Sequence, residues 1–438
     1  MRRIFSDQAR VTHFLQVALA LAKTEAAMGI IPAQAYEEIA RRSKGMTVNW
    51  ERLRQAVEAA RHPGLPFLDQ LAEACGSAAE YLHWGSTNLD VTDTAFILQL
   101  REGLNVVERD ALQVRTILLT MAEDHRSTVM IARTEGMHDR PTTFGFRCAV
   151  WMTELDRQLE RLVSVRTNLT AGPFGGSTGT LAALGARGLE LQASLMAELG
   201  LLASPISWFS ARDRITEVCL ALAMMSSTMA NIARAIVSLT GNEIDELREP
   251  APPGRAAMGS IYHGANAVGC ELVLTHARMA AQNVAVAMES MGHDRDHDSL
   301  GHFKTLVMPQ SFMLAHAAVS QMAMILQGLE IHPARMRQNI DVTRGLVMAE
   351  SVMMALARKT GRRSAHRLIL RACESAVQGS LSLREALLQR REITTLLSTD
   401  EIDEALDPAG FLGCGPQIVE RMIAAARAPQ PRHRFAVH

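Results

Sequence analysis

Residues 215–239, ITEVCLALAMMSSTMANIARAIVSL, carry the pattern that decides the fold class of this chain. Apolar side chains recur at alternating steps of three and four residues, which places them along one face of a helix. They are Ile215, Val218, Leu222, Met225, Met229, Ile232, Ile236 and Leu239. The repeat continues over more than three heptads, a length that is typical of long helices packed in a bundle. The stretch therefore predicts one long helix with a continuous buried seam.

The same spacing occurs in an earlier segment, at Leu104, Val107, Ala111, Val114, Leu118 and Met121. Further long helices are predicted over 142–168, 180–199, 264–291 and 309–329, and Pro309 would occupy the first turn of the last one. Alternating β-branched runs of strand length are almost absent. Seams of this length bury more apolar surface than one chain requires. We therefore expect a homo-oligomer built through the helices that contain 104–121 and 215–239.

Loops rich in glycine, proline or polar residues separate the helical segments. The sequence predicts an all-α protein in which small helical domains flank a long-helix bundle. The predicted domains are an N-terminal helical domain over 1–97, the bundle over 98–341 and a C-terminal helical domain over 342–438.

Composition excludes several classes of function. The 438 residues contain 45 Lys and Arg against 46 Asp and Glu, a net charge of −1 without a polybasic run, so nucleic acid is not an expected partner. We expect no membrane span, since Ser226, Ser227 and Thr228 interrupt the apolar stretch at 218–230. The N-terminus lacks a signal-peptide core, and six scattered cysteines form no CxxC pair. These features predict a reduced, cytoplasmic protein.

The sequence predicts neither a cofactor nor a metal site. It contains no strand-linked GxGxxG, no P-loop and no dithiol. Residues 293–297, HDRDH, crowd four metal-type ligands, and His293 and His297 are four residues apart, but the segment lies between the predicted helices and contains no thiolate. A solvated loop is the preferred interpretation of that segment.

Polar residues that suit an active site concentrate in a few short segments. These are 83–94 (HWGSTNLDVTDT), 133–145 (RTEGMHDRPTTFG), 175–180 (GGSTGT) and 249–267 (EPAPPGRAAMGSIYHGANA). In this order they resemble the motifs of the fumarase/aspartase lyase superfamily, in its adenylosuccinate lyase and 3-carboxymuconate cycloisomerase branch. Segments at 339–347, 361–366 and 406–413 resemble the C-terminal domain of adenylosuccinate lyases. The resemblance covers nearly the whole chain and implies a homotetramer whose active sites combine segments of three subunits.

The first segment matches a motif that binds a carboxylate in this superfamily. The resemblance implies that His83 orients or protonates the leaving side of the substrate, and that Ser86, Thr87 and Asn88 supply short donors to a carboxylate. Asn88 stands where the pattern has serine.

The second segment keeps Arg133 and Thr134 but carries Glu135 where related lyases have histidine. A buried glutamate with a raised pKa could donate a proton. The alternative is that Glu135 forms an ion pair with Arg133, Arg140 or a loop cation. His138 is then the nearest substitute acid, and Arg140 is the nearest additional cation.

The segment at 249–267 is the superfamily's signature loop with altered chemistry. Its serine pair falls on Met258 and Gly259 and its lysine on Gly264, so the expected base and cation are absent. Ser260 could act as the base if the loop shifts by one residue, and Tyr262 and His263 are the other proton carriers. Arg140 or Arg255 would replace the lysine as the anion clamp. Asn266 lies on the pattern, and Asn242 precedes the loop as a further substrate-binding candidate.

The preferred function is a cofactor-independent β-elimination, or the reverse addition, on a succinyl-type polycarboxylate, with fumarate as a product when a succinyl group is cleaved. One alternative is a carboxymuconate-type cycloisomerase, which Glu135 favours. The other alternative is a catalytically inactive family member with an assembly or regulatory role, which the loss of serine and lysine favours. The expected small-molecule partner of the two enzymes is a polycarboxylate.

Overall fold

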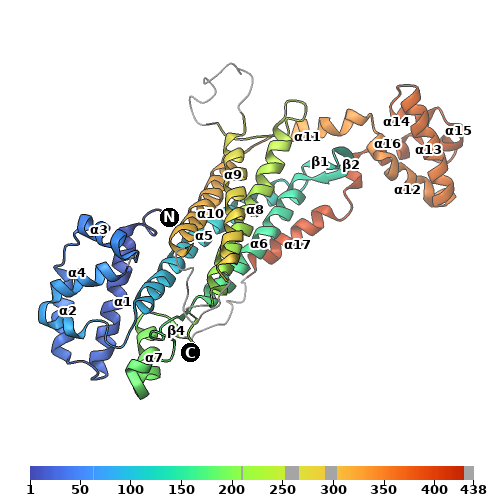
Figure 1. Ribbon diagram of the computed structural model, residues 1–438. Helices are drawn as coiled ribbons and strands as arrows, with labels where there is room; N and C mark the ends of the chain where they lie inside the picture. Colours follow the sequence, from blue (N-terminus) through green and yellow to red (C-terminus); the bar gives the residue numbers. More distant parts are fainter. Residues whose placement is uncertain (63, 209–210, 252–265, 292–302, 429–438) are drawn as a thin grey trace. The chain divides into compact units, whose positions relative to one another are not determined.

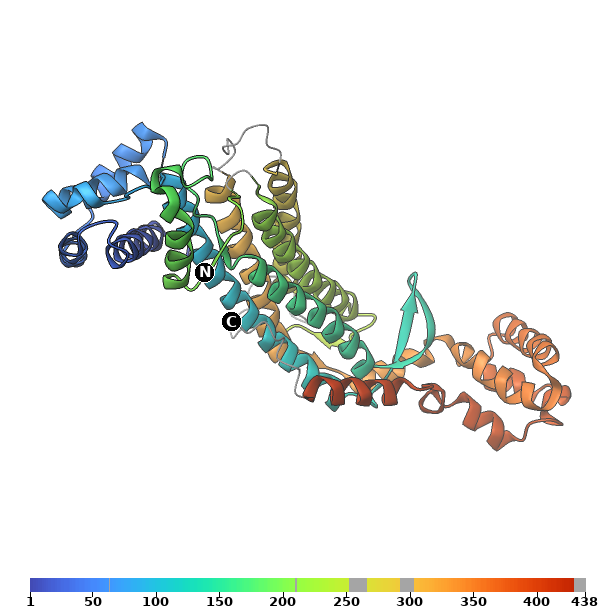
Figure 2. The ribbon, with the colours of Figure 1, turned by 90° about the horizontal axis from the view of Figure 1, so that it is seen from below.

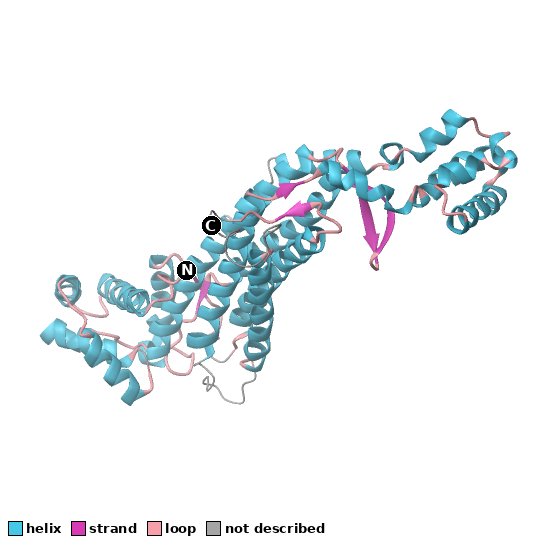
Figure 3. Cartoon of the chain, turned by 90° about the horizontal axis from the view of Figure 1, so that it is seen from above, coloured by secondary structure: helices cyan, strands magenta, loops and turns pink. Residues whose placement is uncertain are grey.

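The computed structural model describes residues 1–62, 64–208, 211–251, 266–291 and 303–428, and helices dominate its regular structure (Figures 1 and 3). The predicted all-α class is confirmed. The chain forms two compact units that interleave along the sequence. Unit 1 comprises Met1–Ala111, Gln158–Ser227 and Thr275–Ser320, and unit 2 comprises Leu112–Arg157, Thr228–Leu274 and Gln321–His438. The three-domain division stays a prediction.

Long helices contribute residues to both units, and within each unit their segments run side by side (Figure 2). They are α5 (Asn88–Asp124), α6 (Phe144–Asn168), α8 (Asp213–Thr240), α9 (Val268–Glu289) and α10 (Phe303–Gln327).

Two of the predicted helices need correction. α10 begins at Phe303, so Pro309 lies inside the helix and not in its first turn. Proline removes one backbone hydrogen bond there, and the buried side chains of Met308 and Phe312 hold the helix in place. The segment 180–199 forms two helices, η2 (Ala182–Arg187) and α7 (Gly188–Glu198), and Gly185, with a φ of +56°, interrupts the helical backbone inside the first one.

The predicted seams are buried inside the chain. Each of the eight apolar positions from Ile215 to Leu239 is at most 2% exposed, and the positions of α5 from Leu104 to Leu118 are at most 1% exposed. These side chains are therefore packed within the chain itself, and the expectation that the helices carrying them form a subunit interface stays a prediction. Exposed apolar residues lie on other faces of the long helices, each between 38% and 58% exposed: Leu112 on α5, Leu220 and Val237 on α8, Leu272, Met279 and Val286 on α9, and Met313 and Met324 on α10.

By length and composition alone, helix α8 could cross a membrane. The sequence analysis expected Ser226, Ser227 and Thr228 to rule this out. However, 61% of its most apolar window is buried inside the chain, as expected for the core helix of a bundle.

The rest of unit 1 consists mainly of shorter helices near the N-terminus, together with one short strand pair. Ser6 caps the first of them by accepting a hydrogen bond from the Ala9 amide at 3.2 Å. The elements are α1 (Asp7–Ala27), α2 (Ala33–Lys44), α3 (Trp50–Ala60), α4 (Leu65–Cys75), η1 (Gly76–Tyr81) and the parallel pair β3 (Ala171–Gly172) and β4 (Leu202–Ala203).

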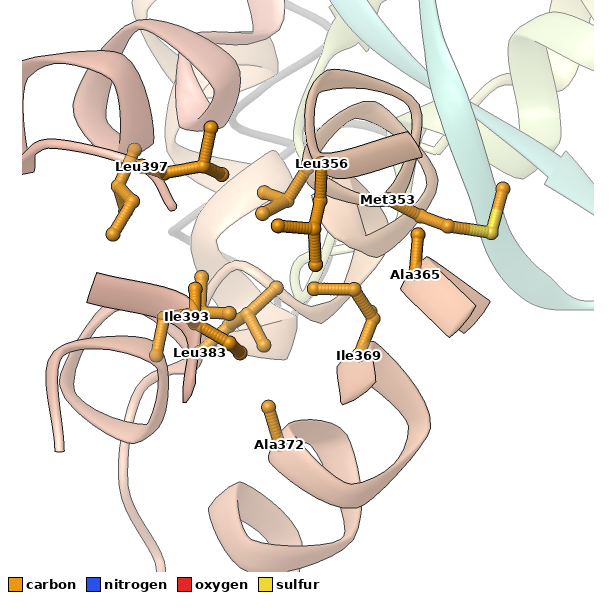
Figure 4. Packing of buried hydrophobic residues seen from close by; sticks show 11 residues of the cluster. Met353, Leu356, Ala365, Ile369, Ala372, Leu383, Ile393 and Leu397 are labelled. Atoms are coloured by element: carbon orange, nitrogen blue, oxygen red, sulfur yellow. The ribbon is translucent and has the colours of Figure 1, made fainter. Parts of the chain in front are cut away.

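Unit 2 adds a β-hairpin, β1 (Val129–Thr134) and β2 (Met137–Thr143), and the short pair β5 (Leu247–Arg248) and β6 (Glu330–Ile331). A buried apolar cluster that includes Leu356, Ile369 and Leu383 lies among the helices between Leu346 and Leu406 (Figure 4). The helices of the C-terminal part follow one another along the chain. They are α11 (Pro333–Ile340), η4 (Asp341–Thr343), η5 (Leu346–Met348), α12 (Ala349–Thr360), α13 (Arg362–Gln378), α14 (Leu383–Leu388), α15 (Arg391–Thr394), α16 (Thr399–Leu406), η6 (Pro408–Phe411) and α17 (Gly415–Arg427).

Candidate active site

The first candidate segment forms the N-terminus of α5. Thr87 precedes the helix, and its backbone amide donates to the Asp90 carboxylate at 2.8 Å, which is one half of a capping box. The Thr87 hydroxyl and the Asn88 amide group make no hydrogen bond within the described residues, while the Ser86 hydroxyl donates to the His83 carbonyl at 3.2 Å. Two side-chain donors therefore remain unpaired at the positive end of a 37-residue helix.

Asp90 ties this helix start to the glycine-rich loop. Its carboxylate accepts from the Gly175 amide at 2.7 Å and from the Gly176 amide at 3.1 Å. Burial raises the pKa of Asp90 to about 6. The hydrogen bonds from the amides of Thr87, Gly175 and Gly176 act in the opposite direction, because they favour the ionised form. The loop can approach this closely because Gly176 adopts a φ of +74°.

His83 is the most unusual side chain of this segment. Its backbone is left-handed, with a φ of +57°, and both ring nitrogens are buried without a hydrogen-bond partner among the described residues. Burial lowers the pKa of His83 to about 4, so the ring is neutral at pH 7. Neither strain nor an unpaired buried ring is favourable in itself, and such features concentrate at functional sites.

A buried ion cluster supports α5 one turn further on, and the sequence analysis did not single it out. Asp93 accepts from Arg212 at 2.8 Å and from Lys304, and each of the three side chains is at most 10% exposed. These partners lower the pKa of Asp93 although burial, the largest influence, acts in the opposite direction. Asp93 lies in the recognised 83–94 segment, whereas no pattern in the sequence points to its partners more than 100 residues away.

The second candidate segment is the β1–β2 hairpin of unit 2. Glu135 and Gly136, with φ of +52° and +84°, form its two-residue turn between the paired Thr134 and Met137. Glu135 and Thr134 are exposed at this tip. The described part of the chain therefore does not bury Glu135, as a role as proton donor would require. The catalytic role of Glu135 stays a prediction.

The base of the hairpin contains a cluster of charges. Arg133 donates to both carboxylate oxygens of Glu246, at 2.6 and 3.1 Å, and the Asn339 amide donates to Glu246 at 2.8 Å. Nearby, His138 has a buried Nδ1 without a partner, and burial and Arg133 lower its pKa. The ion pair between Arg133 and Glu246 thus connects the hairpin to the residues that precede the signature loop.

Arg147, in the first turns of α6, was missed by the sequence analysis. Burial is the main cause that lowers its pKa, and it lies close enough to Glu246 and Arg133 for their charges to act on it. It forms no hydrogen bond or ion pair with any described residue, and Glu246 is already engaged. By contrast, the predicted clamp Arg140 is exposed and paired with Asp139 at 2.9 Å and with Glu350.

The signature loop is anchored at both ends, although Arg255, Ser260, Tyr262 and His263 lie outside the described residues. Glu249 accepts from the Gly269 and Cys270 amides, each at 2.8 Å, and thereby caps α9.

Two predicted substrate-binding residues flank that loop on its described sides. Asn266 and Asn242 are exposed. The carbonyl of Asn266 accepts from the Val268 amide at 2.8 Å.

The structure thus places the predicted site residues in two groups. The segment 83–90 and the glycine loop belong to unit 1, and the hairpin, Asn242 and Asn266 belong to unit 2.

Comparison with known proteins identifies the family. Residues 1–281 match the family described as "Lyase", and residues 345–422 match "Adenylosuccinate lyase C-terminus". The chain belongs to the lyase family of the fumarase/aspartase superfamily.

Relatives within this lyase family differ in activity. The chain is 32% identical to the N-acetyl-S-(2-succino)cysteine lyase of Dickeya dadantii, over 97% of this chain and 94% of the relative. It is 34% identical to the 3-carboxy-cis,cis-muconate cycloisomerase of Pseudomonas aeruginosa, over 98% and 94%. A crystal structure of a fumarate lyase from Mesorhizobium sp. BNC1 matches with a TM-score of 0.91 and 35% identity, over 97% of both chains. Named relatives of this lyase-family chain are thus lyases and cycloisomerases.

Proposed function

We propose that the chain catalyses a cofactor-independent β-elimination, or the reverse addition, on a polycarboxylate with a succinyl-type group. The observation that carries the proposal is the start of α5, where the unpaired donors of Thr87 and Asn88 follow the unpartnered ring of His83. Free donors at a helix N-terminus suit a carboxylate. The succinocysteine lyase relative acts, by its name, on a substrate of this class.

The chemistry requires a base, a proton donor and an anion clamp. A base removes a proton from the carbon beside a carboxylate, and donors and cations hold the dianion that forms. The bond to the leaving group then breaks, and the leaving group takes the electron pair and a proton. In our proposal Ser260, Tyr262 or His263 supplies the base and His83 acts on the leaving side.

The anion clamp has several candidates. Arg255 and Arg140 stay candidates, but Arg140 already has two carboxylate partners. Arg147 is therefore a further candidate, since its guanidinium has no described partner.

A homotetramer is part of this proposal. The site residues fall into two units of the chain and a loop, and the superfamily resemblance implies that such segments meet from different subunits. A neighbouring subunit could also bury Glu135 and supply the partner that His83 lacks.

Intramolecular addition, as in a carboxymuconate-type cycloisomerase, is the second candidate. The glutamate at position 135 and the similarity to the P. aeruginosa cycloisomerase favour it. This reaction closes a ring between a carboxylate and a double bond of the same substrate, so no fumarate is released.

An inactive, assembly or regulatory protein is the third candidate. Gly259 and Gly264, in place of the serine base and the lysine, favour it. The retained His83, Thr87 and Arg133 argue against it, because a scaffold has no need for a strained, unpaired histidine.

A substrate panel separates the three candidates. The purified protein is incubated with N-acetyl-S-(2-succino)cysteine, adenylosuccinate and 3-carboxy-cis,cis-muconate, and products are separated by chromatography. Fumarate release supports the elimination, and a lactone supports the cycloisomerase. No turnover of any of them, with no ligand-induced stabilisation, supports the inactive protein. Adenylosuccinate turnover should be at least about 10³-fold below that of an ordinary adenylosuccinate lyase, because base and lysine are missing.

Substitutions in the signature loop test the assigned base. Ser260→Ala and Tyr262→Phe, made separately, should lower turnover about 10² in at least one variant, the usual scale for a lost acid or base. Folding and tetramer formation should be unchanged. Full activity in both variants would place the catalytic groups elsewhere.

A further inference from the structure

A cavity of unit 1 lies apart from the candidate active-site segments 83–94, 133–145 and 175–180. It has a volume of about 650 Å3 and is lined by the N-terminal turn, α9 and α10. This volume falls within the range of small-molecule sites, about 300–1,000 Å3. Its wall is apolar at Met313, and its polar groups come from Arg2, Arg3, His276 and Gln310.

The N-terminal turn that carries the two arginines is held in place by specific contacts. The ring of Phe5 lies 5.0 Å from that of Phe312 on α10, and the Gln99 amide donates to the Ile4 carbonyl at 2.8 Å. The Ser6 hydroxyl donates to the Arg3 carbonyl at 2.8 Å while it caps α1. Packing and hydrogen bonds thus fix the N-terminal turn, which lies near α10 (Figure 1). Arg2 and Arg3 line the cavity together with residues of α10.

Several polar groups of this cavity lack partners among the described residues. The side chains of Arg2 and Arg3 form no hydrogen bond or ion pair with any described residue, and neither does the Gln310 amide group. His276 Nδ1 is buried without a partner.

None of the described lining residues is acidic. The nearest carboxylate that the contacts identify is Asp110, 3.1 Å behind His316 and already paired with Arg109. Within the described residues, the cavity therefore presents the guanidinium groups of Arg2 and Arg3 without a carboxylate partner, together with the unpaired Gln310 amide, beside an apolar wall.

We propose that this cavity, the cationic pocket, binds a small organic anion in which a carboxylate or phosphate is attached to an apolar body. Arg2 and Arg3 pair with the anionic group, and the Gln310 amide donates to it. The apolar body packs against Met313 and Ala317. Met313 is also one of the exposed apolar residues of α10, so the ligand would lie beside the exposed apolar side chains of that helix.

Titration calorimetry on the intact assembly tests the proposal with defined probes. Phenyl phosphate and hexanoate carry the two anionic groups, and phenol and hexanamide are their uncharged matches. Both anions should bind saturably, more weakly as salt rises, and the uncharged matches should not bind. Comparison of the two anions decides between phosphate and carboxylate.

Paired variants locate the binding. Arg2→Gln with Arg3→Gln should weaken binding about tenfold or more, the scale of a lost charge-assisted hydrogen bond. Ala317→Trp should block the cavity with the same effect. The matched control is Arg41→Gln with Arg42→Gln on α2, which removes the same charge from exposed residues paired with Glu38 and should leave binding unchanged.

Three results would overturn the proposal. The first is the absence of saturable binding of either anion to the native assembly. The second is equal binding of anions and uncharged matches. The third is unaltered anion affinity in both the arginine pair and the Ala317 variant. The readout is binding and not turnover, so it is independent of the proposed reaction.

Discussion

At the scale of single residues, Arg147 is the side chain for which tertiary structure changes the functional argument most. Its guanidinium lacks a described partner beside Glu246, which is already engaged by Arg133 and Asn339. Arg147→Met should therefore lower kcat/KM about 10²-fold, comparable to the loss of one oxyanion donor. Arg147→Lys should recover part of the loss, because it restores the charge without the bidentate geometry.

The control for this prediction is Arg157→Met on the same helix, an exposed arginine that donates to the Thr153 carbonyl. Steady-state kinetics on the substrate identified by the panel provides the measurement. Native kcat/KM in Arg147→Met would assign this arginine to packing alone.

At the scale of elements, the cap of α9 connects the signature loop to the bundle. A Cβ atom at Gly269 would lie 2.8 Å from the Glu249 carboxylate and 2.9 Å from the Gln321 amide. Gly269→Ala should therefore displace the cap and lower the free energy of unfolding by about 1–3 kcal/mol, the usual cost of overpacking. Urea denaturation followed by circular dichroism measures this difference.

The matched control is Gly415→Ala in the first turn of α17, where an added Cβ meets nothing within 4 Å. That change should be neutral or stabilising by up to about 1 kcal/mol. Equal effects of the two substitutions would show that the contact with Glu249 does not matter.

Helix α1 contains a buried acidic side chain, Glu25, whose carboxyl group should affect the stability of the protein. It is fully buried, and neither oxygen has a hydrogen-bond partner in the described part of the chain. Burial raises the pKa of Glu25 from 4.5 to about 8. The folded protein then binds a proton that the unfolded chain releases, so stability is highest below pH 4.5 for this group and falls as pH rises towards 8. The full shift corresponds to roughly 5 kcal/mol at about 1.4 kcal/mol per pKa unit.

Glu25→Gln should remove this pH dependence and stabilise the protein at pH 8. Urea midpoints between pH 5 and pH 8 provide the test, and Glu37→Gln, an exposed residue of α2, is the control. If the native protein and Glu25→Gln show parallel pH profiles, the carboxyl group has a partner or water that keeps it ionised.

At the scale of the whole molecule, the exposed apolar residues of α9 predict how subunits associate. Leu272, Met279 and Val286 repeat every seven residues and are 44–47% exposed, whereas the seam of α8 is buried in the chain. A helix face of this kind is stabilised by a partner. Analytical ultracentrifugation at micromolar concentration should show a tetramer, and Met279→Glu should shift it to smaller species.

Val377→Glu on α13 is the control for that change, because Val377 is 66% exposed outside the bundle. A stable native monomer would remove both the tetramer and the composite site. An unchanged tetramer in Met279→Glu would place the interface on other helices.

Patterns formed by residues close together in the chain were enough to predict a long helix and the family of this protein. The spacing from Ile215 to Leu239 predicted α8 and its buried side, and the ordered motifs predicted the family, since both depend on residues close together in the chain. Helix ends were less predictable: the start of α10 and the break at Gly185 depend on packing and on one backbone angle.

Only the tertiary structure decided the electrostatic state of the candidate site. It buried both nitrogens of His83 without a partner and exposed Glu135 at a hairpin tip. It also paired Asp93 with Lys304, 211 residues away. Desolvation and ion pairing are set by whichever distant segments surround a side chain, and no local pattern encodes those neighbours.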